Sequence, residues 1–176
     1  PEKMEIIMSG VDIERFSKQN EEYNNNLRRR YNIDSNPLVL YVGRLAPRKG
    51  VQYLLHAFKQ VVTDIPTAKL IIVGTGPYES YLKNLANNEK ISNSVIFVGC
   101  VSDKVLPIFY SSADLCVIPS LSEGVAITLL EALASGVPIV CTKLEGTIKF
   151  LGKKKNIVSL VKPGDPNQLA FAIIHV

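Results

Sequence analysis

The sequence predicts an α/β fold built on a doubly wound parallel sheet, and three observations predict it. Short runs of branched apolar residues alternate with longer segments of helical period. The short runs are apolar almost throughout, which is typical of strands in a sheet that is buried on both faces. No repeat or low-complexity linker interrupts the alternation. Strict alternation of strand and helix predicts parallel strands joined by right-handed crossovers.

The elements can be placed in chain order. Strands are expected at six runs, Leu38–Val42, Leu70–Val73, Val95–Val98, Leu115–Ile118, Val137–Cys141 and Ile157–Val161. Helices are expected over Val51–Ile65, Tyr78–Asn88, Val125–Ser135 and Asp165–Val176, where apolar residues recur with helical spacing. Gly136 is expected to end the third of these helices, and Pro138 to stand at the start of the strand that follows.

Length and composition limit the class of protein. The chain has 176 residues, which suits one domain or one lobe of a larger protein. Hydrophobic residues make up 47% and charged residues 20%, so the chain can form a packed core and is not disordered. No apolar run reaches the roughly 18 residues that cross a bilayer. Residues 1–36 are polar and are expected to be an interdomain linker and leading segment, with the domain over 37–176. Pro1 and the helical pattern that runs on to Val176 predict a piece cut from a longer protein.

The basic residues are clustered. The net charge of +4 suits an anionic ligand or an acidic membrane surface, but it is too small to predict nucleic-acid binding. Arg28–Arg30 and Lys153–Lys155 are interpreted either as contacts with an acidic membrane or as solvated faces.

The three cysteines are not spaced as metal ligands. Cys100, Cys116 and Cys141 each lie in or beside an apolar run. This pattern predicts reduced, buried thiols in a cytosolic protein and no metal site.

Ligands of such sheets bind beyond the carboxyl ends of the strands, so candidate binding residues are expected in the loops that follow the strands. After the first expected strand, Arg44 and Lys49 lie between Gly43 and Gly50. A guanidinium fork and an ammonium group at this place could hold a diphosphate. A solvated basic loop is the alternative.

The loop over Gly74–Glu79 begins like a dinucleotide-binding turn. The third glycine of that pattern would fall at position 79, which is Glu79. Pro77 suits a first helical position. The segment is therefore expected to be a tight turn and helix start, which argues against a hydride-transfer enzyme.

Between Leu115 and Thr142 the chain holds only two charged side chains, Glu123 and Glu131. Glu131 lies about two turns inside an otherwise apolar helix, where a carboxylate is costly unless it is hydrogen-bonded. Ribose hydroxyls could satisfy it, or it could reach water or a neighbouring amide. The amides of Gly124–Ala126, at the positive end of the helix, could hold phosphate. Glu123 by itself could be an ordinary first-turn acid.

These motifs occur together in an order that resembles a known family. The motifs are Ser9-Gly10-Val11-Asp12 with Phe16, Gly43-Arg44-Leu45 with Lys49-Gly50, Gly74-Thr75-Gly76-Pro77, Phe97-Val98-Gly99, Glu123-Gly124, Glu131-Ala132-Leu133-Ala134, Gly136-Val137-Pro138 and Pro163-Gly164-Asp165. As a set they resemble the carboxyl-terminal, donor-binding lobe of a retaining glycosyltransferase of family 4, in the group 1 superfamily. The resemblance covers nearly the whole chain. It implies one Rossmann-like lobe of a two-lobe GT-B enzyme with its active site between the lobes.

The resemblance also implies roles for individual residues. Arg44 and Lys49 would bind the donor diphosphate, and together with Glu123, which would face the transferred sugar, they form the expected catalytic set. Gly124, Val125 and Ala126 would contact sugar and phosphate through their amides. Glu131 would bind the ribose hydroxyls, and Gly99, Cys100, Val101 and Ser102 would lie close to the base.

The implied partners are a nucleotide diphosphate sugar as donor and a glycan or lipid-linked acceptor, with no nucleic acid. No metal and no cofactor are expected, because the chain has no Asp-x-Asp pair. The amino-terminal lobe would supply the acceptor groups, so this part alone is expected to transfer little or nothing. The expected location is the cytoplasm, with peripheral association of the whole enzyme with the membrane face as an open alternative.

The chain departs from the family pattern at three places. Ser9 stands where the family usually has Asn, and Val125-Ala126 stands where it often has Phe-Gly or Val-Pro. Lys149 stands where it often has Glu, which reverses the charge. The second and third departures bear on which donor sugar fits.

Two other functions remain as alternatives. A non-catalytic nucleotide- or anion-binding α/β module would carry the same loops with both glutamates structural. A sugar epimerase of the same two-lobe architecture predicts histidine and acid pairs that face the cleft, and the sequence offers none. Only the transferase interpretation requires nucleoside recognition by Glu131.

Overall fold

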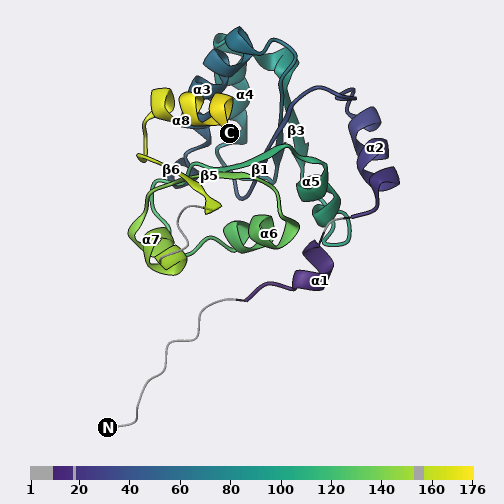
Figure 1. The fold of residues 1–176 in the computed structure, drawn as a ribbon. Coiled ribbons are helices and arrows are strands. Elements are labelled where there is room, and N and C mark those ends of the chain that lie inside the picture. Colours follow the sequence, from purple (N-terminus) through teal and green to yellow (C-terminus); the bar gives the residue numbers. More distant parts are fainter. Residues whose placement is uncertain (1–9, 18, 153–156) are drawn as a thin grey trace.

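The computed structural model describes residues 10–17, 19–152 and 157–176, and its centre is one parallel sheet (Figure 1). The six strands are β1 Leu38–Val42, β2 Lys69–Val73, β3 Val95–Gly99, β4 Leu115–Ile118, β5 Ile139–Thr142 and β6 Ser159–Val161. They lie in the order β3-β2-β1-β4-β5-β6, and each neighbouring pair is parallel. The predicted fold class, a doubly wound α/β sheet, is confirmed.

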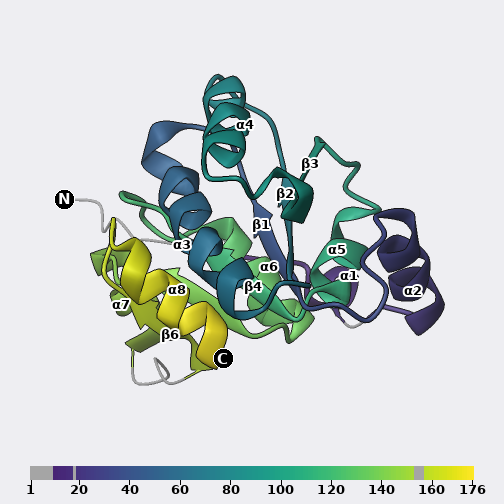
Figure 2. The ribbon, with the colours of Figure 1, turned by 90° about the horizontal axis from the view of Figure 1, so that it is seen from above.

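Helices cover both faces of the sheet. They are α1 Ile13–Phe16, α2 Glu21–Arg30, α3 Val51–Asp64, α4 Glu79–Asn88, α5 Leu106–Ser112, α6 Ile127–Ser135, α7 Glu145–Leu151 and α8 Pro166–His175, with short 3-10 turns η1 Pro47–Lys49 and η2 Ser92–Ser94. Helices α3, α4 and α8 pack on one face, whereas α1, α2, α5, α6 and α7 pack on the other (Figures 1 and 2).

The strands carry no polar face because both of their faces are buried. In β1, Val39 and Tyr41 belong to the core under α3, α4 and α8, while Leu38 and Leu40 belong to the core under α5 and α6. All four are at most 4% exposed. The side chains of a strand point alternately to its two faces, so a strand between two helical layers needs apolar residues at every position.

The segment before β1 packs onto the sheet domain. Phe16, Leu27 and Ile33 are buried in the core on the α5 and α6 side. The Arg28 guanidinium donates to the carbonyls of Ser112, Asp34 and Asn36 and to the Asp114 carboxylate, at 2.8–3.1 Å. These contacts tie α2 to the end of α5. That residues 1–36 also join two lobes stays a prediction.

Several element boundaries differ from those expected; β6, for example, begins at Ser159 and not at Ile157. The helix expected from Val125 begins at Ile127, because Ala126 is still extended, with φ −69° and ψ 125°. The strand expected from Val137 begins at Ile139, directly after Pro138, which has no N–H to give to a strand pairing. Pro77 lies in a turn, and α4 begins two residues later at Glu79.

One prediction about the cysteines is wrong. Cys116 and Cys141 are buried as expected, but Cys100 is exposed, because it follows Gly99 just past the end of the edge strand β3. All three are free thiols. Lys153–Lys155 lie outside the described residues, so the prediction for that cluster stays untested. No helix in the described ranges combines the length and apolar character needed to cross a membrane.

Candidate functional site

The candidate site lies at the carboxyl edge of the sheet, where the strand order reverses. Successive connections from β1 run towards β2 and β3 on one side, while β4, β5 and β6 follow on the other. Diverging connections leave a crevice between the loops after β1 and β4, which is where ligands of doubly wound sheets bind. The loop after β1 is residues 43–50 and the loop after β4 is residues 119–126. Both had been singled out from the sequence.

Close backbone packing joins these two loops. The Leu121 amide donates to the Arg48 carbonyl at 2.8 Å. Gly50 has φ +71°, and a Cβ there would lie 1.9 Å from the Pro119 carbonyl oxygen. A glycine is therefore required at position 50, both for its backbone conformation and for the approach of the second loop.

The contact between the loops continues through charged side chains. The Lys49 ammonium forms an ion pair and hydrogen bond with Glu123 Oε1, and the Ser120 hydroxyl donates to Glu123 Oε2 at 2.9 Å. The side chains of Lys49 and Glu123 are only 16% and 17% exposed. Thr142, at the end of β5, donates to the Ser120 carbonyl at 2.6 Å and holds that turn in place. The structure thus brings two of the predicted catalytic residues into direct contact.

Arg44 lies two residues after the end of β1, in the same loop as Lys49. Its side chain is exposed and forms no ion pair within the described residues. Its carbonyl accepts a hydrogen bond from the Tyr41 hydroxyl at 3.2 Å. Burial raises the pKa of Tyr41 far above its usual range, so the phenol remains a donor at any physiological pH. The Arg44 guanidinium is therefore available to an anion, while the hydrogen bond from Tyr41 fixes the Arg44 backbone.

The loop after β2 supports the loop that carries Arg44. The Leu45 amide donates to the Thr75 carbonyl at 2.9 Å, and the Tyr78 amide donates to the Leu45 carbonyl at 3.1 Å. A Cβ at Gly76 would lie 2.1 Å from the Leu45 carbonyl oxygen. The predicted tight turn is therefore present, and its glycines allow the loop after β2 to pack closely against the loop after β1.

Glu131 is the fifth residue of α6, about one turn from the start of the helix, and is half-buried. The Tyr110 hydroxyl donates to Glu131 Oε2 at 2.7 Å. Burial raises the pKa of the Glu131 carboxyl, and the hydrogen bond from Tyr110 and the positive charge of Arg15 oppose that rise. Tyr110 was missed in the sequence, because it lies 21 residues away on a helix whose pattern was not singled out.

The amides of Gly124–Ala126 precede α6 rather than lying inside it. Ala126 is the N-cap residue, and no side chain caps this helix end. On the other side, Gly146 at the start of α7 packs against the same loop, since a Cβ there would lie 2.0 Å from the Gly124 carbonyl oxygen. Lys149, one turn further along α7, is exposed.

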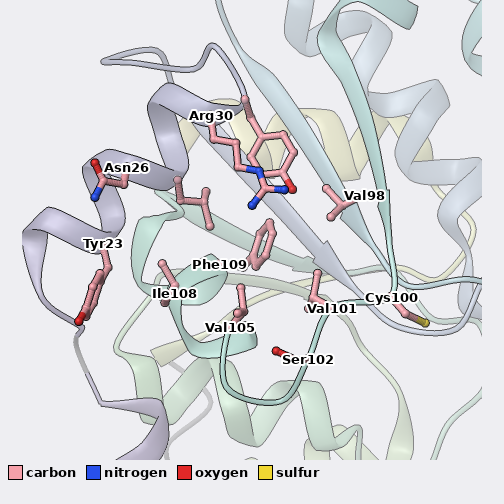
Figure 3. Close-up of a pocket in the computed structure, with 12 residues that line it drawn as sticks. Tyr23, Asn26, Arg30, Val98, Cys100, Val101, Ser102, Val105, Ile108 and Phe109 are labelled. Carbon is pink, nitrogen blue, oxygen red and sulfur yellow. The ribbon is translucent and has the colours of Figure 1, made fainter.

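The residues expected near the base lie after β3, one loop further from the ion pair. Gly99 has φ +78°, and its carbonyl accepts from the Gly74 amide at 2.8 Å. Cys100, Val101 and Ser102 line a cavity of about 480 Å³ between the end of β3, α2 and α5 (Figure 3). Arg44, Lys49, Glu123 and Glu131 do not line this cavity. The residues expected near the base thus lie apart from the Lys49–Glu123 pair.

Within the described ranges, no three His, Cys, Asp or Glu side chains gather into a group that could hold a metal ion. The expectation of a metal-independent site stays a prediction.

Comparison with known proteins places the chain in a family. The family model described as "Glycosyl transferases group 1" matches residues 24–176. An uncharacterized glycosyltransferase of Methanocaldococcus jannaschii is 32% identical over 177 residues, which cover 99% of this chain and 45% of the relative. A GDP-mannose-dependent alpha-(1-6)-phosphatidylinositol monomannoside mannosyltransferase of Mycobacterium tuberculosis is 35% identical over 144 residues, 78% of this chain and 37% of the relative.

Solved structures share the fold. The crystal structure of Anabaena HepE in complex with UDP and glucose matches with a TM-score of 0.87 and 26% identity, over 96% of this chain and 46% of that one. A sucrose-phosphate synthase of Thermosynechococcus elongatus matches with a TM-score of 0.80 and 31% identity, over 93% and 41%. The chain spans less than half the length of these relatives.

Proposed function

The chain belongs to the group 1 glycosyltransferases, and we propose that it is the donor-binding half of such an enzyme. It binds a nucleotide diphosphate sugar, and the sugar passes to an acceptor hydroxyl with retention of its anomeric configuration. One observation carries the proposal: two cations and two carboxylates, Arg44, Lys49, Glu123 and Glu131, come from the loop after β1 and from the loop and helix after β4 at the reversal of strand order.

The diphosphate lies against Arg44 and Lys49. As the bond to the sugar breaks, the leaving diphosphate gains negative charge, and fixed positive groups stabilise that charge more than they stabilise the bound donor. Each well-placed donor of this kind contributes about 3–4 kcal/mol to the lowering of the barrier. The uncapped amides at the start of α6 add to the same positive end. No metal ion is needed for this electrostatic role.

Glu123 orients the transferred sugar. Its two oxygens already accept from Lys49 and Ser120, and each carboxylate oxygen has a second lone pair free for a sugar hydroxyl. The Lys49 ammonium has three protons, so it can keep Glu123 and still donate to phosphate. The ion pair thus holds both groups ready between the diphosphate and the sugar.

Glu131 binds the ribose. Tyr110 occupies one of its oxygens, and the carboxylate can accept from the two ribose hydroxyls with its remaining lone pairs. Backbone groups of Gly99, Cys100, Val101 and Ser102 lie close to the base.

The acceptor is a glycan or a lipid-linked hydroxyl compound, and its binding groups belong to the other half of the protein. The similarity to mannosyltransferases of phosphatidylinositol mannosides and to an alpha-monoglucosyldiacylglycerol synthase of Streptococcus pneumoniae supports this acceptor class. The protein works in the cytoplasm, where nucleotide sugars are made, at or near the membrane face that carries such acceptors.

A second candidate is a non-catalytic nucleotide- or anion-binding module. It is favoured by the Lys49–Glu123 contact itself, because a lysine that is already paired in the free protein can be structural. The two candidates differ at the ribose, since only the transferase requires Glu131 to recognise a nucleoside.

A thermal-shift panel tests the proposal. The protein is heated with UDP, GDP, ADP and their common sugar conjugates, alongside the variants Arg44→Ala and Glu131→Ala. A ligand at 100 times its Kd stabilises by about 2.7 kcal/mol, which is several degrees for a domain of this size. A shift confined to one nucleotide and lost in both variants supports the donor-binding role and identifies the base. A shift with any phosphate compound that survives Glu131→Ala supports the anion-binding module instead.

A further inference from the structure

The short helix α1 contacts both parts of the nucleoside end of the proposed site, which consists of the loop after β3 that begins at Gly99–Ser102 and of the Tyr110–Glu131 pair. It has four residues, begins at the capping carboxylate of Asp12, and packs against α5 and α6 (Figure 1). Its last two residues, Arg15 and Phe16, contact different partners. Phe16 is 3% exposed, so α1 is anchored in the core of the domain by one side chain while the other stays at the surface.

Arg15 holds the loop that follows β3. Its guanidinium donates to the Asp103 carbonyl at 2.7 Å and lies 3.7 Å from the Asp103 carboxylate. Asp103 comes directly after Ser102, the last of the residues expected near the base. A bond from a guanidinium to a backbone carbonyl fixes the path of the loop itself, and the exposed carboxylate adds little because water screens it.

Phe16 packs against Tyr110, the residue that donates a hydrogen bond to Glu131. The rings of Phe16 and Tyr110 meet edge to face with centroids 5.8 Å apart, and Tyr110 is fully buried. The Tyr110 hydroxyl then donates to Glu131. A phenol fixed on one side by an aromatic ring and on the other by a carboxylate has one orientation, so it sets the orientation of the carboxylate as well.

We propose that α1 is a brace for the nucleoside end of the site, in which Arg15 positions the backbone near the base and Phe16 and Tyr110 position the carboxylate of Glu131 for the ribose. The inference rests on the proposed function, because it takes Glu131 as the ribose ligand. Arg15 and Tyr110 are positioning residues, since neither needs to touch the nucleotide. The brace makes nucleoside recognition depend on a segment that precedes the sheet domain in the chain.

Two ligands separate this role from a merely structural one. A nucleoside diphosphate uses both ends of the site, whereas inorganic pyrophosphate uses only the phosphate end at Arg44 and Lys49. We would measure the Kd of pyrophosphate and of whichever of UDP, GDP or ADP binds best, by calorimetry on the intact protein and on Tyr110→Phe and Arg15→Gln. Tyr110→Phe keeps the ring and its packing on Phe16, and Arg15 is 37% exposed, so both variants are expected to fold.

Each variant is expected to weaken the nucleotide about tenfold, the equivalent of losing one hydrogen bond to a charged group, and to leave pyrophosphate within about twofold. The matched control is Lys69→Gln, which removes another cation that donates to a backbone carbonyl, that of Asn93 at 2.9 Å, at the amino end of β2 and so at the opposite edge of the sheet. It should leave the ratio of the two Kd values unchanged.

The Kd values distinguish a brace from a merely structural role of α1. An unchanged nucleotide Kd in either variant overturns the brace, and so does an equal loss for nucleotide and pyrophosphate. Glu131→Gln tells which proposal has failed. If that variant weakens the nucleotide while Tyr110→Phe and Arg15→Gln do not, only the brace is wrong. If Glu131→Gln itself leaves the nucleotide unaffected, the ribose contact of the proposed function is wrong.

Discussion

Lys49 and Glu123 lie 74 residues apart in the chain and form an ion pair across the crevice at the carboxyl edge of the sheet. The lysine comes from the turn before α3 and the glutamate from the loop before α6. The second oxygen of the carboxylate is held by Ser120 at 2.9 Å. In the free protein this pair is the charged link between the two loops that would surround a donor.

The pair should therefore be coupled in stability even without a ligand. Lys49→Met leaves the largely buried Glu123 without its cation, and Glu123→Gln leaves Lys49 without its anion; each should cost about 2 kcal/mol in the free energy of unfolding. The loss in the double variant should be at least about 1 kcal/mol smaller than the summed losses of the two single variants, because the second substitution removes the charge that the first one left unpaired. Urea unfolding of the four proteins measures this, and strictly additive losses would show that the pair contributes nothing.

Glu131 should make stability depend on pH in a particular direction. Burial raises its pKa in the folded protein above the ordinary value of 4.5. At a pH between 4.5 and the raised pKa of the folded protein, the folded protein keeps a proton on Glu131 that the unfolded chain has released. The free energy of unfolding therefore falls as the pH rises through this range. Glu131→Gln removes the effect. The advantage of the wild type over this variant should shrink from pH 4 to pH 8 in urea unfolding, and a constant or growing advantage would contradict the raised pKa.

Substitution by alanine should destabilise the protein more at Gly50 than at Gly136, although the two glycines have similar backbone conformations. Gly50 and Gly136 have φ +71° and +69°, but a Cβ at Gly50 would lie 1.9 Å from the Pro119 carbonyl oxygen, whereas none at Gly136 would meet an atom within 4 Å. Gly136→Ala should cost about 1 kcal/mol for the left-handed conformation alone. Gly50→Ala should cost about 2 kcal/mol or more beyond that, because the loops must separate. Thermal unfolding of both variants measures the difference, and equal losses would contradict the contact between the loops.

Arg28 should act as a structural residue, unlike its neighbour Arg29. The Arg28 side chain is 16% exposed and its guanidinium is bonded to three carbonyls and to Asp114. Arg28→Gln should lower the free energy of unfolding by about 2–3 kcal/mol. Arg29→Gln, at an exposed position of the same helix, should change it by less than about 0.5 kcal/mol. Equal effects would contradict the bonds of Arg28.

The residues of the Arg28–Arg30 cluster also differ in whether they could contact an acidic membrane. The charge of Arg28 is used inside the domain, so only Arg29 and Arg30 of this cluster are exposed to an acidic surface. If the cluster contacts membrane, Arg29→Gln and Arg30→Gln together should weaken sedimentation of the protein with vesicles that contain anionic lipid. Unchanged sedimentation would favour the interpretation as a solvated face.

The strands and the helical layers could be predicted because the information is local. β1 and β4 occupy the residues expected of them, since a strand between two helical layers must be apolar at every position. The boundaries at Ile127 and Ile139 were misplaced by two residues, because apolar residues continue beyond the element and only the backbone marks its end. The exposure of Cys100 was also missed, because an apolar neighbourhood in the chain does not tell where an edge strand stops.

By itself the sequence determined that this protein is a parallel α/β sheet and that charged residues gather in the loops after two of its strands, because both features are written in neighbouring residues. The tertiary structure alone decided which of those residues meet. The pairing of Lys49 with Glu123, the hydrogen bond from Tyr110 to Glu131 and the hold of Arg15 on the Asp103 carbonyl join residues that are far apart in the chain. Such contacts depend on the order of the strands in the sheet, and that order is set by the packing of the whole domain.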